Sequence, residues 1–246
     1  MRVKVIKTDI DYNTTKDFFR KRAKKYNDMN PYSVTMYQDN NPELVHKRNK
    51  LEKEKLIRYL NLDKNSKVLD LACGIGRWAD ATKEVVGSYL GVDFSEEMIK
   101  IAKRRNTNPN VSFEVGSAVE LDTLFKGSQL FNRILIFGLF MYLNDSDVFR
   151  TSYLVEKYCE PETIICIREP IGIESRLTIK DHFSNELNDV YNAVYRTRDE
   201  LVELIKPSLL DKGFDIIQED YLFNNSNLNN RKETAQYFLI LKRKKC

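Results

Sequence analysis

The chain has 246 residues, of which 42% are hydrophobic and 31% are charged, and its formal net charge is +4. This composition predicts a soluble globular protein of one α/β-sized domain. The longest apolar run, residues 134–143, is too short to cross a bilayer, and the first residues lack the apolar region of a signal peptide. Two histidines exclude a His-rich metal site, and four scattered cysteines predict a reduced, cytoplasmic protein.

The positive charge is concentrated at the amino terminus. Residues 1–50 carry 12 Lys and Arg against 6 Asp and Glu, and the densest run is RKRAKK at residues 20–25. Such a run either collects an anionic partner or forms the solvated face of a helix. The sequence pI of 8.7 does not favour nucleic acid as that partner.

Residues 1–62 are interpreted as an N-terminal helical cap, because helical periodicity is their main pattern. The first predicted helix covers residues 14–27 and has Phe19 and Tyr26 on its apolar stripe. The second covers about residues 42–60 and is followed by a region in which strands and helices alternate.

In the second predicted helix, Arg48 lies between Leu44 and Leu51 on the stripe that faces a core. A buried arginine needs an anion, because an unpaired buried charge is costly. Arg48 is therefore a candidate anion ligand, with an internal salt bridge as the alternative.

Strands and helices alternate after residue 62, which predicts a mostly parallel, doubly wound α/β sheet. The last two strands follow each other without a helix, so we expect them to form an antiparallel pair at one edge. The predicted strands are residues 67–72, 88–93, 111–115, 133–137, 163–169, 214–223 and 235–245. The predicted helices are residues 76–85, 95–105, 146–159 and 197–213.

Residues 170–195 are too many for an ordinary connection. They follow the carboxyl end of a strand, where open α/β sheets bind ligands. We therefore predict that this insertion forms part of a cover over the substrate.

A glycine turn follows the first strand of the alternating region. Residues 74–79 read GIGRWA, which fits the G-x-G-x-x-G/A pattern of nucleotide-binding turns. Asp70 precedes the turn, and its carboxylate would repel a diphosphate but suits a ligand that carries an ammonium and a sulfonium. Asp93 ends the second strand and can accept both ribose hydroxyls, while Phe94 and Met98 can lie against an adenine.

Four successive segments resemble the motifs of class I methyltransferases that use S-adenosylmethionine (SAM): VLDLACGIGRWA, LGVDFSEEMIKIAKRR, EVGSAVEL and FNRILIFGLFMYLND. The resemblance covers about residues 64–168 well and extends more loosely to the last predicted helix and the strand after it. It implies a seven-stranded Rossmann-like sheet with an antiparallel last strand in residues 63–246. It also implies SAM as the methyl donor and S-adenosylhomocysteine (SAH) as the product.

Carried over position by position, the resemblance implies a set of cofactor contacts. The glycine turn would line the methionine and ribose of SAM, and later residues would reach its adenine and its amine. These implied contacts are Asp70, Ala72, Cys73, Gly74, Gly76, Asp93, Phe94, Met98, Ser117, Ala118, Phe137 and Gly138. Arg48 is the candidate partner of the SAM carboxylate. Tyr26 either covers SAM or simply ends a core stripe.

Three positions depart from the family pattern. Ala72 replaces the first motif glycine, and Ser117 replaces an acid that often precedes the adenine contact. Asn132 replaces the aspartate that usually opens the fourth strand, so any contact it makes lacks that charge.

The candidate catalytic side chains are Tyr142, just past the fourth strand, and His182, in the predicted cover. Arg22 and Lys25 are candidate ligands for the acceptor. Acidic oxygens such as those of a phosphate or phosphoramidate need no general base, so we expect in-line O-methylation of a small anionic acceptor. The amino-terminal pattern is also similar to methyltransferases found with bacterial capsule or surface-sugar biosynthesis.

Two other function classes stay open at this point. An NAD-type oxidoreductase fits the glycine turn, but Asp70 disfavours it. A catalytically silent SAM-binding module is the second alternative. A homodimer is also open, whereas membrane and nucleic-acid partners are not expected.

Overall fold

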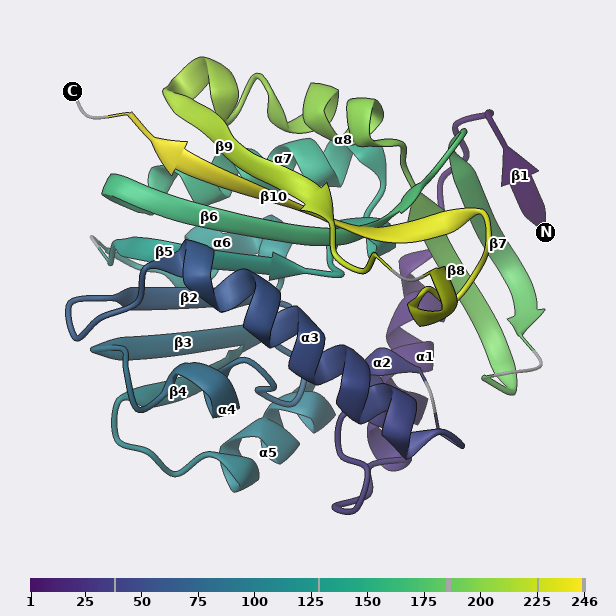
Figure 1. Ribbon diagram of the computed structural model, residues 1–246, viewed down its shortest axis with the longest axis horizontal. Coiled ribbons are helices and arrows are strands. Elements are labelled where there is room, and N and C mark those ends of the chain that lie inside the picture. Colours follow the sequence, from purple (N-terminus) through teal and green to yellow (C-terminus); the bar gives the residue numbers. More distant parts are fainter. Residues whose placement is uncertain (38, 128, 185–186, 225, 245–246) are drawn as a thin grey trace.

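Within the described residues, seven strands form one sheet in the order β4-β3-β2-β5-β6-β10-β9 (Figure 1). The structure is a computed structural model that describes residues 1–37, 39–127, 129–184, 187–224 and 226–244. The bounds of these strands are β2 Lys67–Leu71, β3 Ser88–Asp93, β4 Val111–Val115, β5 Phe131–Phe137, β6 Cys159–Gly172, β9 Phe214–Tyr221 and β10 Thr234–Arg243.

Strands β2 to β6 of this sheet run parallel, and β10 runs antiparallel to both of its neighbours, β6 and β9. The predicted doubly wound α/β sheet with an antiparallel last strand is therefore confirmed. Apolar residues fill both faces of the central strands, as expected when helices cover the two sides. Position 245, the end of the last predicted strand, lies outside the described residues.

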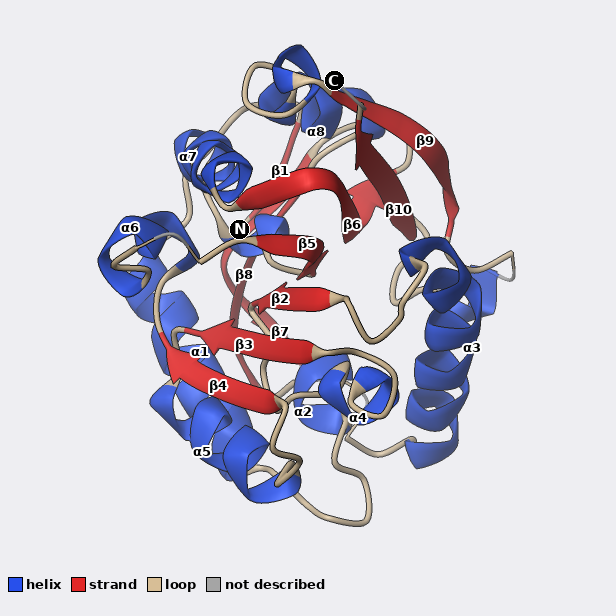
Figure 2. Ribbon diagram, turned by 90° about the vertical axis from the view of Figure 1, so that its left-hand side faces the viewer, coloured by secondary structure: helices blue, strands red, loops and turns tan. Residues whose placement is uncertain are grey.

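Helices cover both faces of the sheet and give three layers (Figure 2). One face of the sheet packs on the three helices that come later in the chain, through residues such as Val148 and Leu201. The other packs on the earlier helices, through residues such as Leu56 and Ile99. The first group is α6 Leu121–Leu124, α7 Asp145–Lys157 and α8 Arg198–Ile205, and the second is α3 Pro42–Leu60, α4 Ala79–Thr82 and α5 Glu96–Arg105.

The predicted stripe of α3 is only partly correct. Arg48 is buried as expected, and Leu44 and Leu51 are half-buried and pack against the core. The buried stripe consists of Val45, Arg48, Asn49, Glu52, Leu56 and Leu60. Leu56 and Leu60 join the core of the sheet, so the second half of α3 is part of the central layers. The polar members of the stripe lie toward its start and face the site described below.

Two other predicted helices are shorter than expected. The helix predicted over residues 197–213 ends at Ile205, because Pro207 cannot continue a helix and disfavours helical backbone before it. Residues 76–85 contain only the single turn α4. The glycine turn occupies the start of that segment instead.

The predicted cover is a β-hairpin. It consists of β7 Leu177–Ser184 and β8 Asp189–Tyr195, and the amino-terminal strand β1 Arg2–Lys4 pairs with β7. Helix α1, Tyr12–Lys24, packs on the hairpin through Phe18 and Tyr191. The hairpin and α1 thus lie beside each other at one end of the sheet (Figure 1). Positions 185–186 of the predicted cover lie outside the described residues.

Within the described residues, no helix has the length and apolar character needed to cross a bilayer.

Candidate active site

Two cavities meet at the carboxyl ends of β2, β3 and β5. The cavity that more of the predicted cofactor residues line, called the main cavity, extends from the glycine turn to the hairpin and the start of β10. The adjoining cavity, which is larger, extends from Phe94 to residues 115–120. Five residues line both cavities, so the two form adjacent parts of one site. These shared residues are Ala72, Asp93, Phe94, Leu139 and Tyr142.

The glycine turn adopts backbone conformations that favour glycine. Gly74 and Gly76 have φ angles of +55° and +76°, and Ala72 has +59°. A Cβ on Gly74 would lie 2.9 Å from the Thr35 Cγ2, so this glycine also permits close packing against the amino-terminal region. Gly76 packs on Phe113 and does not line either cavity, although Gly74 does.

Asp93 fixes the glycine turn from the end of β3. Its two carboxylate oxygens accept hydrogen bonds of 2.9 Å from the backbone N–H groups of Gly74 and Ser95. Burial raises the pKa of Asp93 to about 6, despite these two bonds. The carboxylate therefore joins β3 to the turn and lies where both cavities meet.

Asp70 places a second carboxylate in the main cavity. The Tyr89 hydroxyl donates a hydrogen bond to it, and burial raises its pKa to about 7. Arg77 and Arg168 oppose this rise, whereas nearby Asp93 adds to it. A cation that enters the cavity would therefore stabilise the ionised form of Asp70.

A buried charge cluster centred on Glu52 borders the same cavity. The Glu52 carboxylate, with 2% of its surface exposed, pairs with Arg77 and with Arg168, whose Nε lies 3.3 Å from Oε2. The Trp78 indole N–H donates to Glu52 at 3.0 Å. Burial opposes ionisation of Glu52, but the charges of Arg168 and Arg77 outweigh it and lower its pKa.

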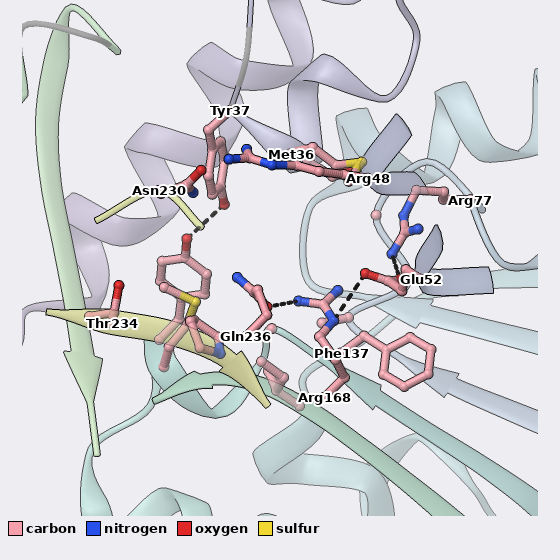
Figure 3. A pocket seen from close by; sticks show the side chains of 18 of the residues that line it. Met36, Tyr37, Arg48, Glu52, Arg77, Phe137, Arg168, Asn230, Thr234 and Gln236 are labelled. Atoms are coloured by element: carbon pink, nitrogen blue, oxygen red, sulfur yellow. Dashed lines mark hydrogen bonds and ion pairs between the residues drawn. The ribbon is translucent and has the colours of Figure 1, made fainter. Parts of the chain in front are cut away.

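Figure 3 shows this cluster on one side of the main cavity and Tyr37, Asn230 and Thr234 on the other. Arg48 also lines the cavity and is 5% exposed. The cluster contains residues that the sequence patterns did not single out, namely Glu52, Arg77 and Arg168. The sequence did not predict a buried Glu52, because the expected core stripe of α3 did not include this position. A glutamate in a helix also normally lies at the surface.

Four tyrosine hydroxyls form a chain along the hairpin side of the main cavity. Tyr142 lies 2.7 Å from Tyr37 and 3.3 Å from Tyr191, oxygen to oxygen, and Tyr191 lies 2.9 Å from Tyr195. Arg231 ends the chain by donating to Tyr195 at 2.9 Å. Of this chain, the sequence indicated only Tyr142.

Most of the predicted cofactor residues surround the two cavities. The main cavity includes Arg48, Asp70, Cys73, Gly74, Met98, Phe137 and Gly138, and the adjoining cavity includes Ser117 and Ala118. Tyr26 lies outside both linings, where its hydroxyl donates to Asp28 and accepts from Arg105.

Three other predicted residues also lie outside the cavity linings. His182 is exposed on β7. Arg22 is buried in an ion pair with Asp39, and Lys25 donates to the backbone oxygen of Leu187. The basic run of α1 is thus largely engaged within the protein, while Lys16 and Arg20 line the adjoining cavity. Among the described residues, no cluster of three or more His, Cys, Asp or Glu could hold a metal ion.

Residues 68–161 match the family model described as "Methyltransferase domain". Over this stretch the chain has a Rossmann-like fold. The demethylmenaquinone methyltransferase of Staphylococcus carnosus is 30% identical over 91 residues, which are 35% of this chain. The chain spans only 38% of that relative's length.

Solved structures share the fold over nearly the whole chain. Phosphoethanolamine N-methyltransferase 1 of Haemonchus contortus, in complex with phosphoethanolamine and SAH, matches with a TM-score of 0.70 and 18% identity. That match covers 96% of this chain and 50% of the other. A DhpI–SAH complex matches with a TM-score of 0.65 and 15% identity, over 94% of this chain and 96% of the other.

Replacing Glu52 with Ala should destabilise the protein strongly. Removal of one partner from a buried ion pair costs about 3–5 kcal/mol, because the opposite charges stay buried without compensation. Chemical denaturation measures the free energy of unfolding. Glu54→Ala, an exposed glutamate two residues along the same helix, is the matched control and should change it by less than about 0.5 kcal/mol. Equal effects of the two substitutions would contradict the assigned role.

Proposed function

We propose that this chain is a SAM-dependent methyltransferase that acts on a small acceptor. The observation that carries the proposal is the pair of carboxylates, Asp70 and Asp93, on either side of a glycine turn where two cavities meet. The match to a methyltransferase domain over residues 68–161 and the SAH held by two structural neighbours support it.

The residues present suit each part of SAM. The Asp70 carboxylate would accept the ammonium, and Arg48 would pair with the carboxylate at the same end of the ligand. Asp93 would accept the ribose hydroxyls, and the adenine would lie by Phe94 and Ser117 in the adjoining cavity. The alternative, a dinucleotide, would bring its diphosphate against the buried Asp70, which is unfavourable.

When bound, SAM supplies an electrophilic methyl group that an acceptor oxygen can take by in-line displacement, with SAH as the product. The residues of the chain would align the acceptor oxygen with the methyl group and exclude water. Leu139 and Tyr142 line both cavities and would lie beside SAM where it passes from one cavity to the other. Burial raises the pKa of Tyr142, so its hydroxyl stays protonated and would orient the acceptor as a hydrogen-bond partner.

The acceptor that we propose carries an anionic oxygen. The hairpin side of the main cavity offers the tyrosine hydroxyls together with Arg231, and the described residues lining this cavity include neither His nor Lys. An oxygen that is already ionised needs no general base, so it suits such a site. Arg231, rather than the predicted Arg22 and Lys25, is the side chain that we assign to the anion. A link to surface-sugar synthesis stays a prediction from sequence.

Thermal unfolding with SAM, SAH, NAD and NADP tests the proposed cofactor. A ligand at about 100 times its dissociation constant adds roughly 2.7 kcal/mol, which corresponds to a rise of a few degrees at this chain length. SAM and SAH should give that rise, and Asp93→Ala should abolish most of it. A rise with NAD or NADP alone would replace the proposal with the oxidoreductase alternative. SAH binding without methyl transfer to any acceptor would favour a silent module.

The affinity for SAH should fall as the pH is lowered through the range around 7. Burial raises the pKa of Asp70 to about 7, so a growing fraction of its carboxyl is protonated below that pH and cannot accept an ammonium. Between about pH 8.5 and 6.5 the ionised fraction, and with it the affinity, should fall about fourfold. Calorimetric titrations between about pH 6.5 and 8.5 measure it, and Asp70→Asn should bind more weakly with little pH dependence over that range. A pH-independent affinity in the unsubstituted protein would contradict the role of Asp70.

Paired acceptors test the proposed anion. Phosphoethanolamine and glycerol phosphate should accept the methyl group from labelled SAM, whereas ethanolamine and glycerol should not. Arg231→Ala should lower kcat/KM for the anionic acceptor by about 10-fold to 100-fold, since hydrogen bonds to charged groups are worth roughly 1.5–3 kcal/mol. Its affinity for SAH should stay unchanged. Lys232→Ala, at the exposed neighbouring position, is the matched control. Preference for the neutral acceptors would overturn the anionic assignment.

A further inference from the structure

The segment after β5, residues 138–143, lies at the centre of the site. Gly138, Leu139, Met141 and Tyr142 line the main cavity, and Leu139 and Tyr142 also line the adjoining one. We call this segment the β5 loop. Gly138 has a φ angle of +65°, and residues 140–142 form a single 3-10 turn. A segment of this kind has few internal hydrogen bonds, so its position depends on what holds it from outside.

Glu169 holds the N–H groups of the β5 loop. Its Oε1 accepts hydrogen bonds from the backbone N–H groups of Leu139 at 2.8 Å and Phe140 at 3.0 Å, and its Oε2 accepts from Met141 at 3.1 Å. Glu169 is 3% exposed and lines neither cavity, whereas its neighbours in β6, Arg168 and Pro170, line the main one. Because successive side chains of a strand point to opposite faces, Glu169 points away from the main cavity and toward the β5 loop.

Arg196 holds the carbonyl groups of the same loop. Its guanidinium donates to the backbone oxygens of Phe140 and Leu143, both at 2.7 Å, and its Nε donates to the Asp145 carboxylate at 2.8 Å. Arg176, just before β7, pairs with Asp145 as well. Since Arg196 directly follows β8, this contact ties the loop to the hairpin that lines the main cavity.

We propose that Glu169 and Arg196 are positioning residues that grip the β5 loop from its N–H and carbonyl sides and so fix the loop and the hairpin relative to each other. The proposal rests on the proposed function only for the identity of the ligand that the loop faces. The grip itself follows from five hydrogen bonds, three accepted by Glu169 and two donated by Arg196.

The charge of Glu169 is what allows one side chain to satisfy three donors. A carboxylate only accepts hydrogen bonds, whereas an amide or a protonated carboxyl presents a donor on one side. Burial raises the pKa of Glu169 to about 7, and the N–H groups together with Arg168 oppose that rise. Glu169→Gln therefore preserves size and shape but turns one of the three bonds into a contact between two donors.

Hydrogen exchange of the ligand-free protein tests the grip directly. Glu169→Gln should speed exchange of the Leu139, Phe140 and Met141 amides by about tenfold or more, because charge-assisted hydrogen bonds are among the stronger ones. Exchange in β2 and β5 should stay unchanged. Glu174→Gln removes an exposed glutamate in the turn before β7 and should leave the loop as it is. Arg196→Lys should speed exchange of the loop as well, because an ammonium cannot span the same three acceptors.

SAH binding by calorimetry supplies the second readout. Glu169→Gln should weaken it about tenfold, and Glu169→Asp, which keeps the charge, should recover part of the loss. Unchanged loop exchange in Glu169→Gln would overturn the proposal, as would faster exchange spread evenly over the whole protein. If the unsubstituted protein binds no SAH, the proposed function fails, while the exchange data still decide the grip. If Glu169→Gln does not fold, Glu169→Asp and Arg196→Lys provide the same comparison.

Discussion

One buried carboxylate, that of Glu52, joins three parts of the chain that form the site. It comes from α3 and meets Arg77 beside the glycine turn and Arg168 in β6. Without it, two largely buried arginines at the wall of the main cavity would lose their ion-pair partner, at a large cost in free energy. Glu52 therefore links α3, the glycine turn and β6 at the wall of the main cavity.

The sequence was enough to predict what depends on local patterns. Alternating strands and helices gave the sheet, and the glycine turn with Asp70 and Asp93 marked its ligand-facing edge. These features repeat over short distances and need no knowledge of distant partners. The prediction was wrong where a single residue interrupts the pattern. Pro207 ends α8 earlier than expected, and charged residues lie on the buried face of α3.

The rest of the site depends on contacts between distant segments. Glu52 lies 25 residues before Arg77, and Tyr37 meets Tyr142 across 105 residues, so neither pairing leaves a trace in local periodicity. Arg22 illustrates the converse case. Its place in a basic run predicted a ligand for an anionic acceptor, but in the structure its guanidinium is buried against Asp39. A charged residue type alone does not say whether its partner is internal or a ligand.

The pairing of β1 with β7 has a consequence for how the protein is made. Val3 lies opposite Thr178, so the amino-terminal strand emerges from the ribosome long before its partner exists. Contacts that are distant in sequence form late because closing the intervening loop costs entropy. The central sheet can therefore start to assemble while the cover is still incomplete. Ligand-binding competence is then a late event in the life of each new chain, because the start of β10, which also lines the main cavity, is synthesised after the hairpin.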